Sequence, residues 1–134
     1  MATHNTLFQA SDVRRLPDGS GIAVSVQLPW YRSLWLSAVD GVEVSVNGTP
    51  VPKDRIRFEL QGRSYAVDEL PEQSETLWFV ADRPDVVAHL DEVPAPGESV
   101  TVEVVLTMRL LYMQIAPQRY VTNRVPVERE VVLA

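Results

Sequence analysis

Val100-Thr101-Val102-Glu103-Val104-Val105-Leu106-Thr107-Met108 is the stretch of this chain that decides its fold class. Apolar side chains occupy every second position of the stretch, which is the period of a β-strand with one face against a core. No other segment of the 134 residues alternates for so long, so we expect a central strand here. The chain then becomes apolar at consecutive positions over 110–113, as happens when a strand is covered on both faces, one cover being the core and the other a partner.

Shorter alternating segments lie on both sides of this strand. They are residues 22–28, 42–46, 56–60, 63–67, 76–80 and, in the tail, 127–133. Asn47-Gly48 and Gln61-Gly62 predict tight hairpin turns, because such pairs accept the positive backbone dihedrals that these turns need. Pro94-Ala95-Pro96-Gly97 predicts another turn. The segment 85–90 fits either one helical turn or a short edge strand.

About eight or nine short strands, ten prolines and no amphipathic helix predict an antiparallel β-sandwich, with a β-barrel as the alternative. A length of 134 residues fits one domain, which we place over 1–134. We expect a flexible N-terminus over about 1–6. The C-terminal tail, about 122–134, is assigned only loosely, as a strand interrupted by charged residues.

Composition restricts the partners and the compartment. A net charge of −6 and dispersed arginines argue against nucleic acid and anionic membrane surfaces as ligands. The chain has no cysteine, hence no disulfide framework or thiolate metal site, and no apolar run of the roughly 20 residues that cross a bilayer. We therefore expect a cytoplasmic protein.

Aromatic residues gather in the segment 28–37, which fits neither strand alternation nor helical spacing. Its candidate contact residues are Trp30, Tyr31, Arg32, Leu34 and Trp35. A second group consists of Tyr112, Met113, Arg119 and Tyr120. Such side chains serve as core packing, as the energetic centre of a protein interface, or as a stacking platform for sugars, and the pattern leaves all three open.

Catalytic chemistry finds little support in the residues. The two histidines, His4 and His89, lie far from any recognisable serine motif, so we assign no catalytic residue. His89 and its acidic neighbours form the one cluster that resembles a metal site: Asp82, Asp85, Asp91 and Glu92. We interpret this cluster, and the acidic run over 68–75, as solvated surface and expect no metal in this chain.

Several of these features together resemble the small β subunit of bacterial C-glycoside deglycosidases. They are the segment Leu28–Ser37, the hairpin Val42–Gly48, and Phe58, Gly62, Tyr65, Leu70 and Trp78-Phe79. The resemblance extends over roughly residues 8–120. It implies a β-sandwich that is the non-catalytic subunit of a carbon–carbon lyase, which cleaves 3-oxo-C-glucosides of flavonoids by enolate formation and elimination.

The resemblance also implies a partner, an α subunit with a TIM barrel that binds a divalent metal such as manganese, in a higher-order hetero-oligomer. The two aromatic groups named above would then form the interface. A stand-alone carbohydrate-binding module and a self-associating structural domain are the alternatives. Whether this chain touches substrate, which aglycone is preferred and how many copies assemble stay open.

Overall fold

The computed structural model describes residues 7–28, 33–116 and 119–133, with the side chains of residues 110–123 outside that description. Four short 3₁₀ helices lie in these ranges: η2 (Ala10–Asp12), η3 (Leu36–Ala38), η4 (Lys53–Arg55) and η5 (Val67–Glu72). The strands are β1 (Val13–Arg15), β2 (Gly21–Ser25), β3 (Leu34–Trp35), β4 (Val39–Val46), β5 (Thr49–Pro50), β6 (Ile56–Leu60), β7 (Arg63–Ala66), β8 (Leu77–Trp78), β9 (Asp85–His89), β10 (Ser99–Ala116) and β11 (Arg119–Val132).

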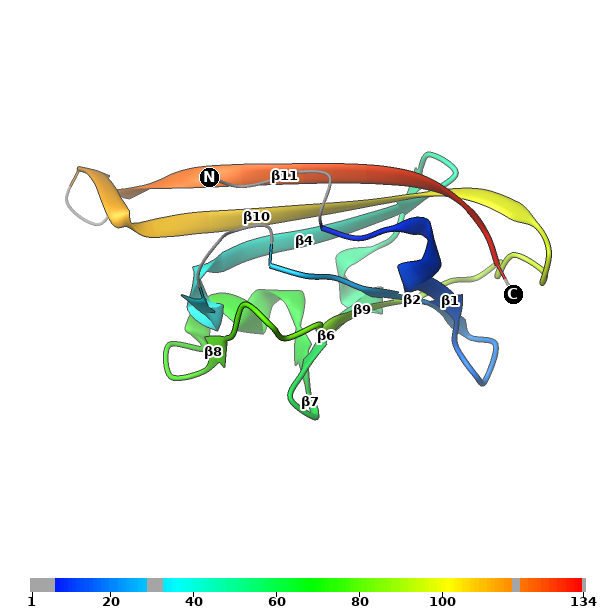
Figure 1. Cartoon of the computed structure of the whole chain (residues 1–134), viewed down its shortest axis with the longest axis horizontal. Helices are drawn as coiled ribbons and strands as arrows, with labels where there is room; N and C mark the ends of the chain where they lie inside the picture. The colour runs from blue at the N-terminus through cyan, green and yellow to red at the C-terminus, as the bar shows by residue number, and fades with distance from the viewer. Residues whose placement is uncertain (1–6, 29–32, 117–118, 134) are drawn as a thin grey trace.

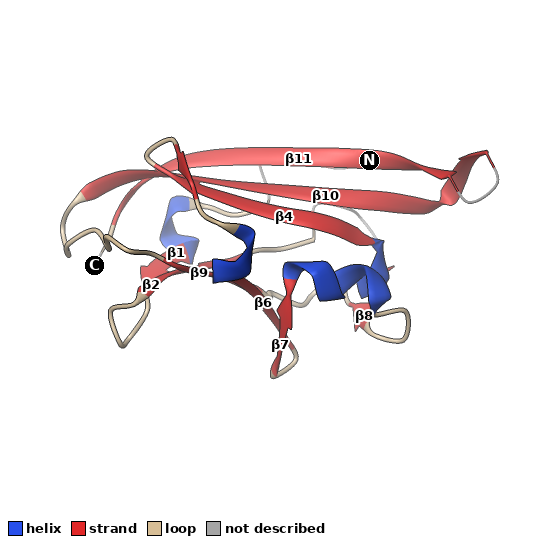
Figure 2. Ribbon diagram, turned by 180° about the vertical axis from the view of Figure 1, so that it is seen from behind, coloured by secondary structure: helices blue, strands red, loops and turns tan. Residues whose placement is uncertain are grey.

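Two antiparallel sheets face each other and make the predicted sandwich (Figures 1 and 2). The upper sheet in Figure 1 has the strand order β11-β10-β4-β5, and the lower one has the order β1-β2-β9-β6-β7. The short pair β3-β8 lies at one end. The described strands do not close into a ring, so the barrel alternative is set aside.

The core lies between the sheets and follows the predicted alternation. Every second residue of β10 from Val100 to Met108 is at most 2 % exposed. Phe58 of β6 and Trp78 of β8 are fully buried, with ring centroids 5.5 Å apart in an edge-to-face arrangement. This geometry adds about 0.5–1.5 kcal/mol to the burial of the two rings.

The predicted turns are confirmed by their backbone angles. Asn47 and Gly48 have φ of 50° and 81°, and Gln61 and Gly62 have φ of 53° and 78°. These are the left-handed values that a two-residue hairpin turn requires. The turns therefore fix the registers of β4 with β5 and of β6 with β7.

Some expected strands change in length or place. β8 holds only Leu77 and Trp78, and β2 ends at Ser25. The segment 85–90 is neither a helical turn nor an edge strand, because β9 lies between β2 and β6. Its Ala88 is opposite Ile22 on one side and Ile56 on the other. β11 occupies most of the tail, and the short strands β1, β3 and β5, which lie outside the predicted segments, raise the strand number above the prediction.

A two-stranded extension of the upper sheet leaves the body of the sandwich. β4 pairs with β10 only as far as Met108, which lies opposite Val39. Beyond Arg109, β10 and β11 pair only with each other, up to Ala116 opposite Arg119, with a register shift between Leu110 and Gln114. We call residues 110–116 and 119–121 the hairpin arm. It extends past β8 at the left of Figure 1.

Candidate functional site

Three large apolar side chains stand half-exposed on the β3-β8 end of the molecule. Trp35 of β3 is 48 % exposed, and Phe79 and Val80, which directly follow β8, are 50 % and 48 % exposed. We call these three residues the apolar patch. Exposed apolar clusters of this kind mark interaction sites more often than single exposed residues do.

Local pairing explains why Trp35 and Phe79 face outward. Leu34 is opposite Trp78 and Trp35 is opposite Leu77 in the β3-β8 pair. Strand alternation turns the neighbours of a buried residue to the other face, so burial of Trp78 leaves Phe79 outside. The backbone N–H of Val80 donates to the hydroxyl of Ser33 at 2.9 Å, which keeps the two chain segments together.

The chain beneath the patch is held firmly. The indole N–H of Trp78 donates to the carbonyl of Asp82 at 3.3 Å, and the N–H of Leu36 donates to the carbonyl of Thr76 at 2.7 Å. The backbone that carries the patch is thus held in place before binding, which favours a role of these residues as anchors.

The predicted interface residues have different outcomes. Leu34 is partly buried and packs against the core, whereas Trp35 is exposed. Trp30, Tyr31 and Arg32 lie outside the described residues. Tyr112 and Met113 of β10 and Arg119 and Tyr120 of β11 belong to the hairpin arm, and their side chains also lie outside the description. Their role in an interface stays a prediction.

Sequence reasoning did not include Phe79 and Val80 in the interface. The signal was present, because burial of Trp78 in an alternating segment turns Phe79 to the opposite face. The prediction of a strand over 76–80 does not specify which face of that strand stays uncovered.

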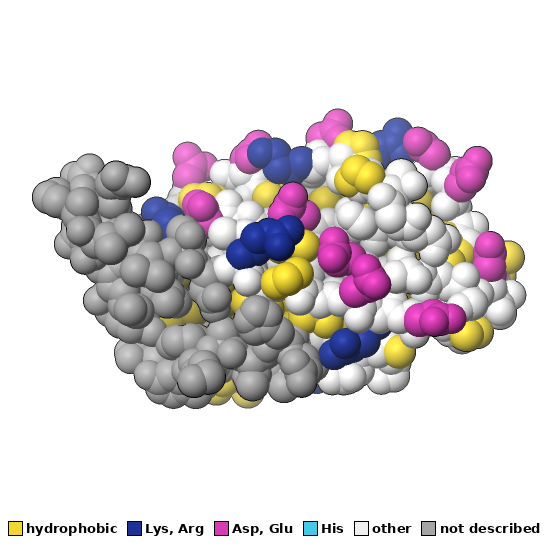
Figure 3. Space-filling model, turned by 90° about the horizontal axis from the view of Figure 1, so that it is seen from above, with side chains coloured by type: hydrophobic (Ala, Val, Ile, Leu, Met, Phe, Trp, Pro, Cys, Tyr) yellow, Lys and Arg dark blue, Asp and Glu magenta, His cyan; other side chains and the backbone are white. Residues whose placement is uncertain are grey.

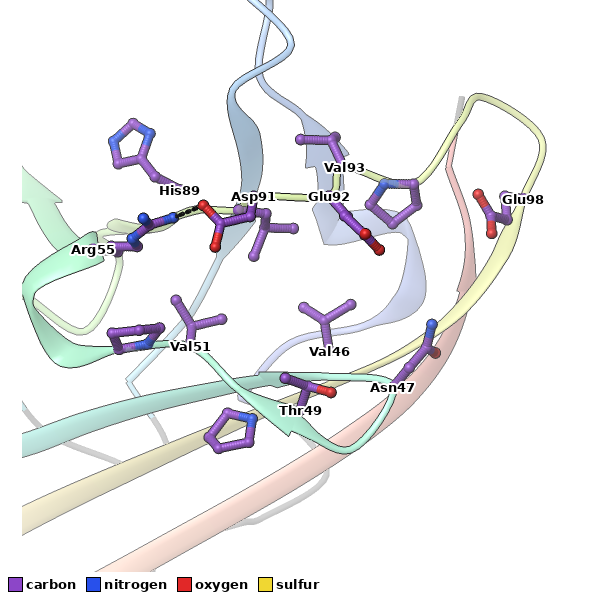
Figure 4. A pocket seen from close by; sticks show the side chains of 14 residues that line it. Val46, Asn47, Thr49, Val51, Arg55, His89, Asp91, Glu92, Val93 and Glu98 are labelled. Atoms are coloured by element: carbon purple, nitrogen blue, oxygen red, sulfur yellow. Dashed lines mark hydrogen bonds and ion pairs between the residues drawn. The ribbon is translucent and has the colours of Figure 1, made fainter.

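A cavity of about 730 Å³ opens between the sheets at the far end of the molecule from the patch (Figure 4). Apolar groups such as Val46, Val51 and Val93 line it together with charged side chains that are exposed. Arg55 forms an ion pair with Asp91 across its mouth, and Glu98 accepts a hydrogen bond from the N–H of Ala95 at 2.8 Å. The groups that Figure 4 shows at this opening are largely solvated.

A second cavity of about 490 Å³ lies along the lower sheet and is lined mainly by polar residues. Asp85 on its wall is held by Arg14 at 2.8 Å and by the hydroxyl of Ser25 at 2.8 Å. Asp82 accepts a hydrogen bond from the side-chain amide of Gln61 at 3.1 Å. Asp82 and Asp85 are thus engaged with neighbouring side chains.

The acidic neighbours of His89 do not converge on it. Asp82, Asp85 and Asp91 have the separate partners given above, and His89 Nδ1 lies 3.3 Å from the Ser20 hydroxyl. Within residues 7–28, 33–116 and 119–133, no three histidine, aspartate or glutamate side chains come together as a metal site. His89, Asp91 and Glu92 are exposed, whereas Asp82 and Asp85 are partly buried and hydrogen-bonded.

Among the described residues, acidic and basic side chains share the outer side of the upper sheet. Figure 3 shows acidic and basic side chains interspersed over the part of that face that is coloured. Such a mixed surface does not attract a polyanion. No helix among the described residues is long and apolar enough to traverse a lipid bilayer.

Comparison with known proteins gives a consistent family. A family model described as C-glycoside deglycosidase beta subunit matches residues 4–112. A C-glycoside deglycosidase beta subunit of Arthrobacter globiformis is 70 % identical over 134 residues, covering 100 % of both chains. One of Microbacterium trichothecenolyticum is 36 % identical over 74 % of both chains, and a 3'-dehydrocarminate deglycosidase beta subunit of a Microbacterium species is 32 % identical over 74 % of both. The patterned strands, the turns and this full-length similarity place the chain in the family of C-glycoside deglycosidase beta subunits.

Proposed function

We propose that this chain is the non-catalytic small subunit of a heteromeric C-glycoside deglycosidase and that it docks on a larger catalytic subunit through the apolar patch. One observation carries the proposal. The side chains of Trp35, Phe79 and Val80 are each about half exposed, on backbone that hydrogen bonds hold in place. The relatives are themselves named beta subunits of deglycosidases, which supports a role in an assembly.

The proposed reaction is a lyase reaction on 3-oxo-C-glucosides of flavonoids. A ketone at sugar carbon 3 acidifies the proton on carbon 2, and removal of that proton gives an enolate. Its electrons then form the carbon 1–carbon 2 double bond while the bond from carbon 1 to the aglycone breaks, and the aglycone carbon takes up a proton. In this proposal the base and a divalent metal, manganese, belong to a TIM-barrel partner.

The role of this chain is to hold the larger subunit in its working shape. A buried tryptophan at the centre of an interface contributes about 2–4 kcal/mol by truncation, or roughly 30- to 1000-fold in the dissociation constant. The apolar patch supplies one such ring in Trp35 and a second aromatic ring in Phe79. Contributions of this size from Trp35 and Phe79 make the affinity for the larger subunit depend on these two rings.

Sugar stacking is the alternative use of an exposed tryptophan ring. Sugar sites combine that ring with polar groups that bind hydroxyls, whereas the other exposed members of this patch are Phe79 and Val80. The composition of the patch therefore favours a protein partner. Calorimetry of the isolated chain with C- and O-glucosides tests the alternative, because only a carbohydrate-binding module gives heat of binding there.

The test of docking uses the purified chain, the larger subunit and their mixture with a 3-oxo-C-glucoside. We expect turnover only in the mixture, and we expect Trp35→Ala to raise the dissociation constant by roughly 30-fold or more. Val132→Ala is the matched control, because Val132 is 66 % exposed near the end of β11 away from the hairpin arm. Full activity of the larger subunit alone, or unchanged binding by Trp35→Ala, contradicts the proposal.

A further inference from the structure

Arg109 joins the root of the hairpin arm to the segment that carries Trp35. It follows the last residue of β10 that pairs with β4. Its guanidinium Nη2 donates to the carbonyl of Ser37 at 2.5 Å, and its Nε lies 3.7 Å from a carboxylate oxygen of Asp40. Ser37 belongs to η3, two residues after Trp35. One side chain thus connects the residue that precedes the arm with the segment that follows Trp35.

The Ser37 side of this connection is itself fixed. The N–H of Ser37 donates to the carbonyl of Gln73 at 3.1 Å, next to η5, and Ser37 is only 8 % exposed. Leu36 and Ala38, its neighbours in η3, are fully buried. Arg109 therefore binds the arm to a rigid base and not to a mobile loop.

The hydrogen bond to Ser37 matters more than the ion pair with Asp40. A charged donor on a partly buried carbonyl forms one of the stronger hydrogen bonds in proteins. The Asp40 side chain is 45 % exposed and 3.7 Å away, so water screens most of that attraction. Loss of the guanidinium therefore mainly releases the carbonyl of Ser37.

The hairpin arm depends on the contact between Arg109 and Ser37 for its position. A two-stranded ribbon is at best marginally stable by itself in water, and the arm has only its own two strands beyond Arg109. Its sequence over 110–113 is Leu-Leu-Tyr-Met, which is apolar at consecutive positions. A segment of that composition is stable when another surface covers it.

The patch alone is too small for a stable interface. Half-exposed side chains of this size offer roughly 300 Å² in total, against about 800 Å² per partner in a standard interface. The arm lies at the same end of the molecule as β3 and β8 (Figure 1). Two contact elements held at a fixed spacing bind one partner more tightly than two independent ones.

We propose that Arg109 is a positioning residue that holds the hairpin arm in line with the apolar patch, so that both contact one larger subunit at the same time. The inference rests on the proposed function, since the occupant of both elements is the catalytic subunit. It adds that the binding surface has two parts and that their alignment is set by Arg109 and Ser37.

The experiment measures binding of the full chain to the larger subunit by calorimetry or biolayer interferometry. We expect Arg109→Gln to weaken binding by roughly 10- to 100-fold, because alignment of two linked contacts carries a gain of this order. Arg109→Lys keeps a charged donor and recovers part of the affinity. Arg63→Gln, an exposed arginine on β7 of the other sheet, is the matched control and leaves binding unchanged.

A double variant separates positioning from a general loss of stability. Once Trp35→Ala has removed a patch contact, alignment matters less, so Arg109→Gln should weaken the Trp35→Ala variant by no more than about threefold. If Arg109→Gln weakens binding equally in the wild-type chain and in the Trp35→Ala variant, or if Arg109→Gln binds as tightly as wild type, the positioning role is wrong. Either result leaves the proposed function intact. If the wild-type chain forms no complex with the larger subunit, the proposed function fails too. If the isolated chain forms a dimer that Arg109→Gln dissociates, the occupant is a second copy and the proposal is wrong.

Discussion

Asp18, in the turn between β1 and β2, is a case in which one side chain is controlled by local hydrogen bonds. Its carboxylate accepts from the hydroxyl of Ser20 at 2.7 Å and from the N–H of Ser20 at 3.0 Å. The hydroxyl bond first, and the backbone bond second, lower the pKa of Asp18 below its ordinary value of 3.8, with a small further contribution from His89. The folded turn therefore favours the ionised carboxylate.

Replacement of Ser20 by alanine should raise the pKa of Asp18 toward 3.8, which an NMR titration of its carboxyl carbon measures. Because the folded pKa lies below the unfolded one, the stabilising effect is present above pH 3.8 and disappears as the pH falls through the folded value. The stability difference between wild type and variant should shrink on acidification. Ser11→Ala is the control, and an Asp18 pKa unaffected by Ser20→Ala refutes the assignment.

At the scale of elements, the turn between β4 and β5 is tied to the neighbouring central strand. The side-chain oxygen of Asn47 accepts from the N–H of Thr101 at 2.8 Å, and the N–H of Asn47 donates to the carbonyl of Thr101 at 2.8 Å. Asn47 therefore has two structural roles. It tolerates positive φ in the turn, and its hydrogen bonds continue the pairing of β4 with β10.

Asn47→Ala should lower the free energy of unfolding by about 1–2 kcal/mol, which combines left-handed strain with the lost side-chain hydrogen bond. Asn47→Gly removes only the hydrogen bond and should fall between the alanine variant and wild type. Urea unfolding followed by circular dichroism gives both values. An alanine variant as stable as wild type means that neither contribution operates here.

Elements were predictable where the signal was local. Alternation located the body of β4, β6 and β10, and the Asn-Gly pair located a turn. The position of β9 between β2 and β6 was not predictable, because six residues with no strict alternation do not specify their neighbours in a sheet. Pairing of Ala88 with Ile22 and Ile56 is a long-range event that sequence periodicity does not report.

For the whole molecule, the two ends of the sandwich differ in character. The apolar patch and the hairpin arm lie at one end, while the solvated cavity around Arg55 and Asp91 lies at the other (Figures 1 and 4). The sequence predicts Trp35 as a contact residue but does not predict this arrangement, because the distance between surface residues depends on how the sheets stack. It also missed Arg109, whose partner Ser37 is 72 positions away in the chain.

Docking through the apolar patch, as we propose, predicts a weak dependence of assembly on salt. We expect the dissociation constant with the larger subunit to change less than about threefold between 50 and 500 mM sodium chloride, because screening acts mainly on charge pairs. Sedimentation at several salt concentrations measures this. A tenfold weakening over that range assigns docking to charged side chains and contradicts the use of the patch.

The late position of β9 and β10 in the chain has a consequence for biosynthesis. β9 is the common neighbour of β2 and β6, and β10 is the long partner of β4. Neither sheet can therefore complete its pairing before residues 85–116 are present. Until the ribosome has released that segment, a nascent chain carries strands with open edges and an incomplete hydrophobic interior. Fragments that end before Asp85 should thus be captured by chaperones or precipitate, and the subunit matures only after its synthesis is almost finished.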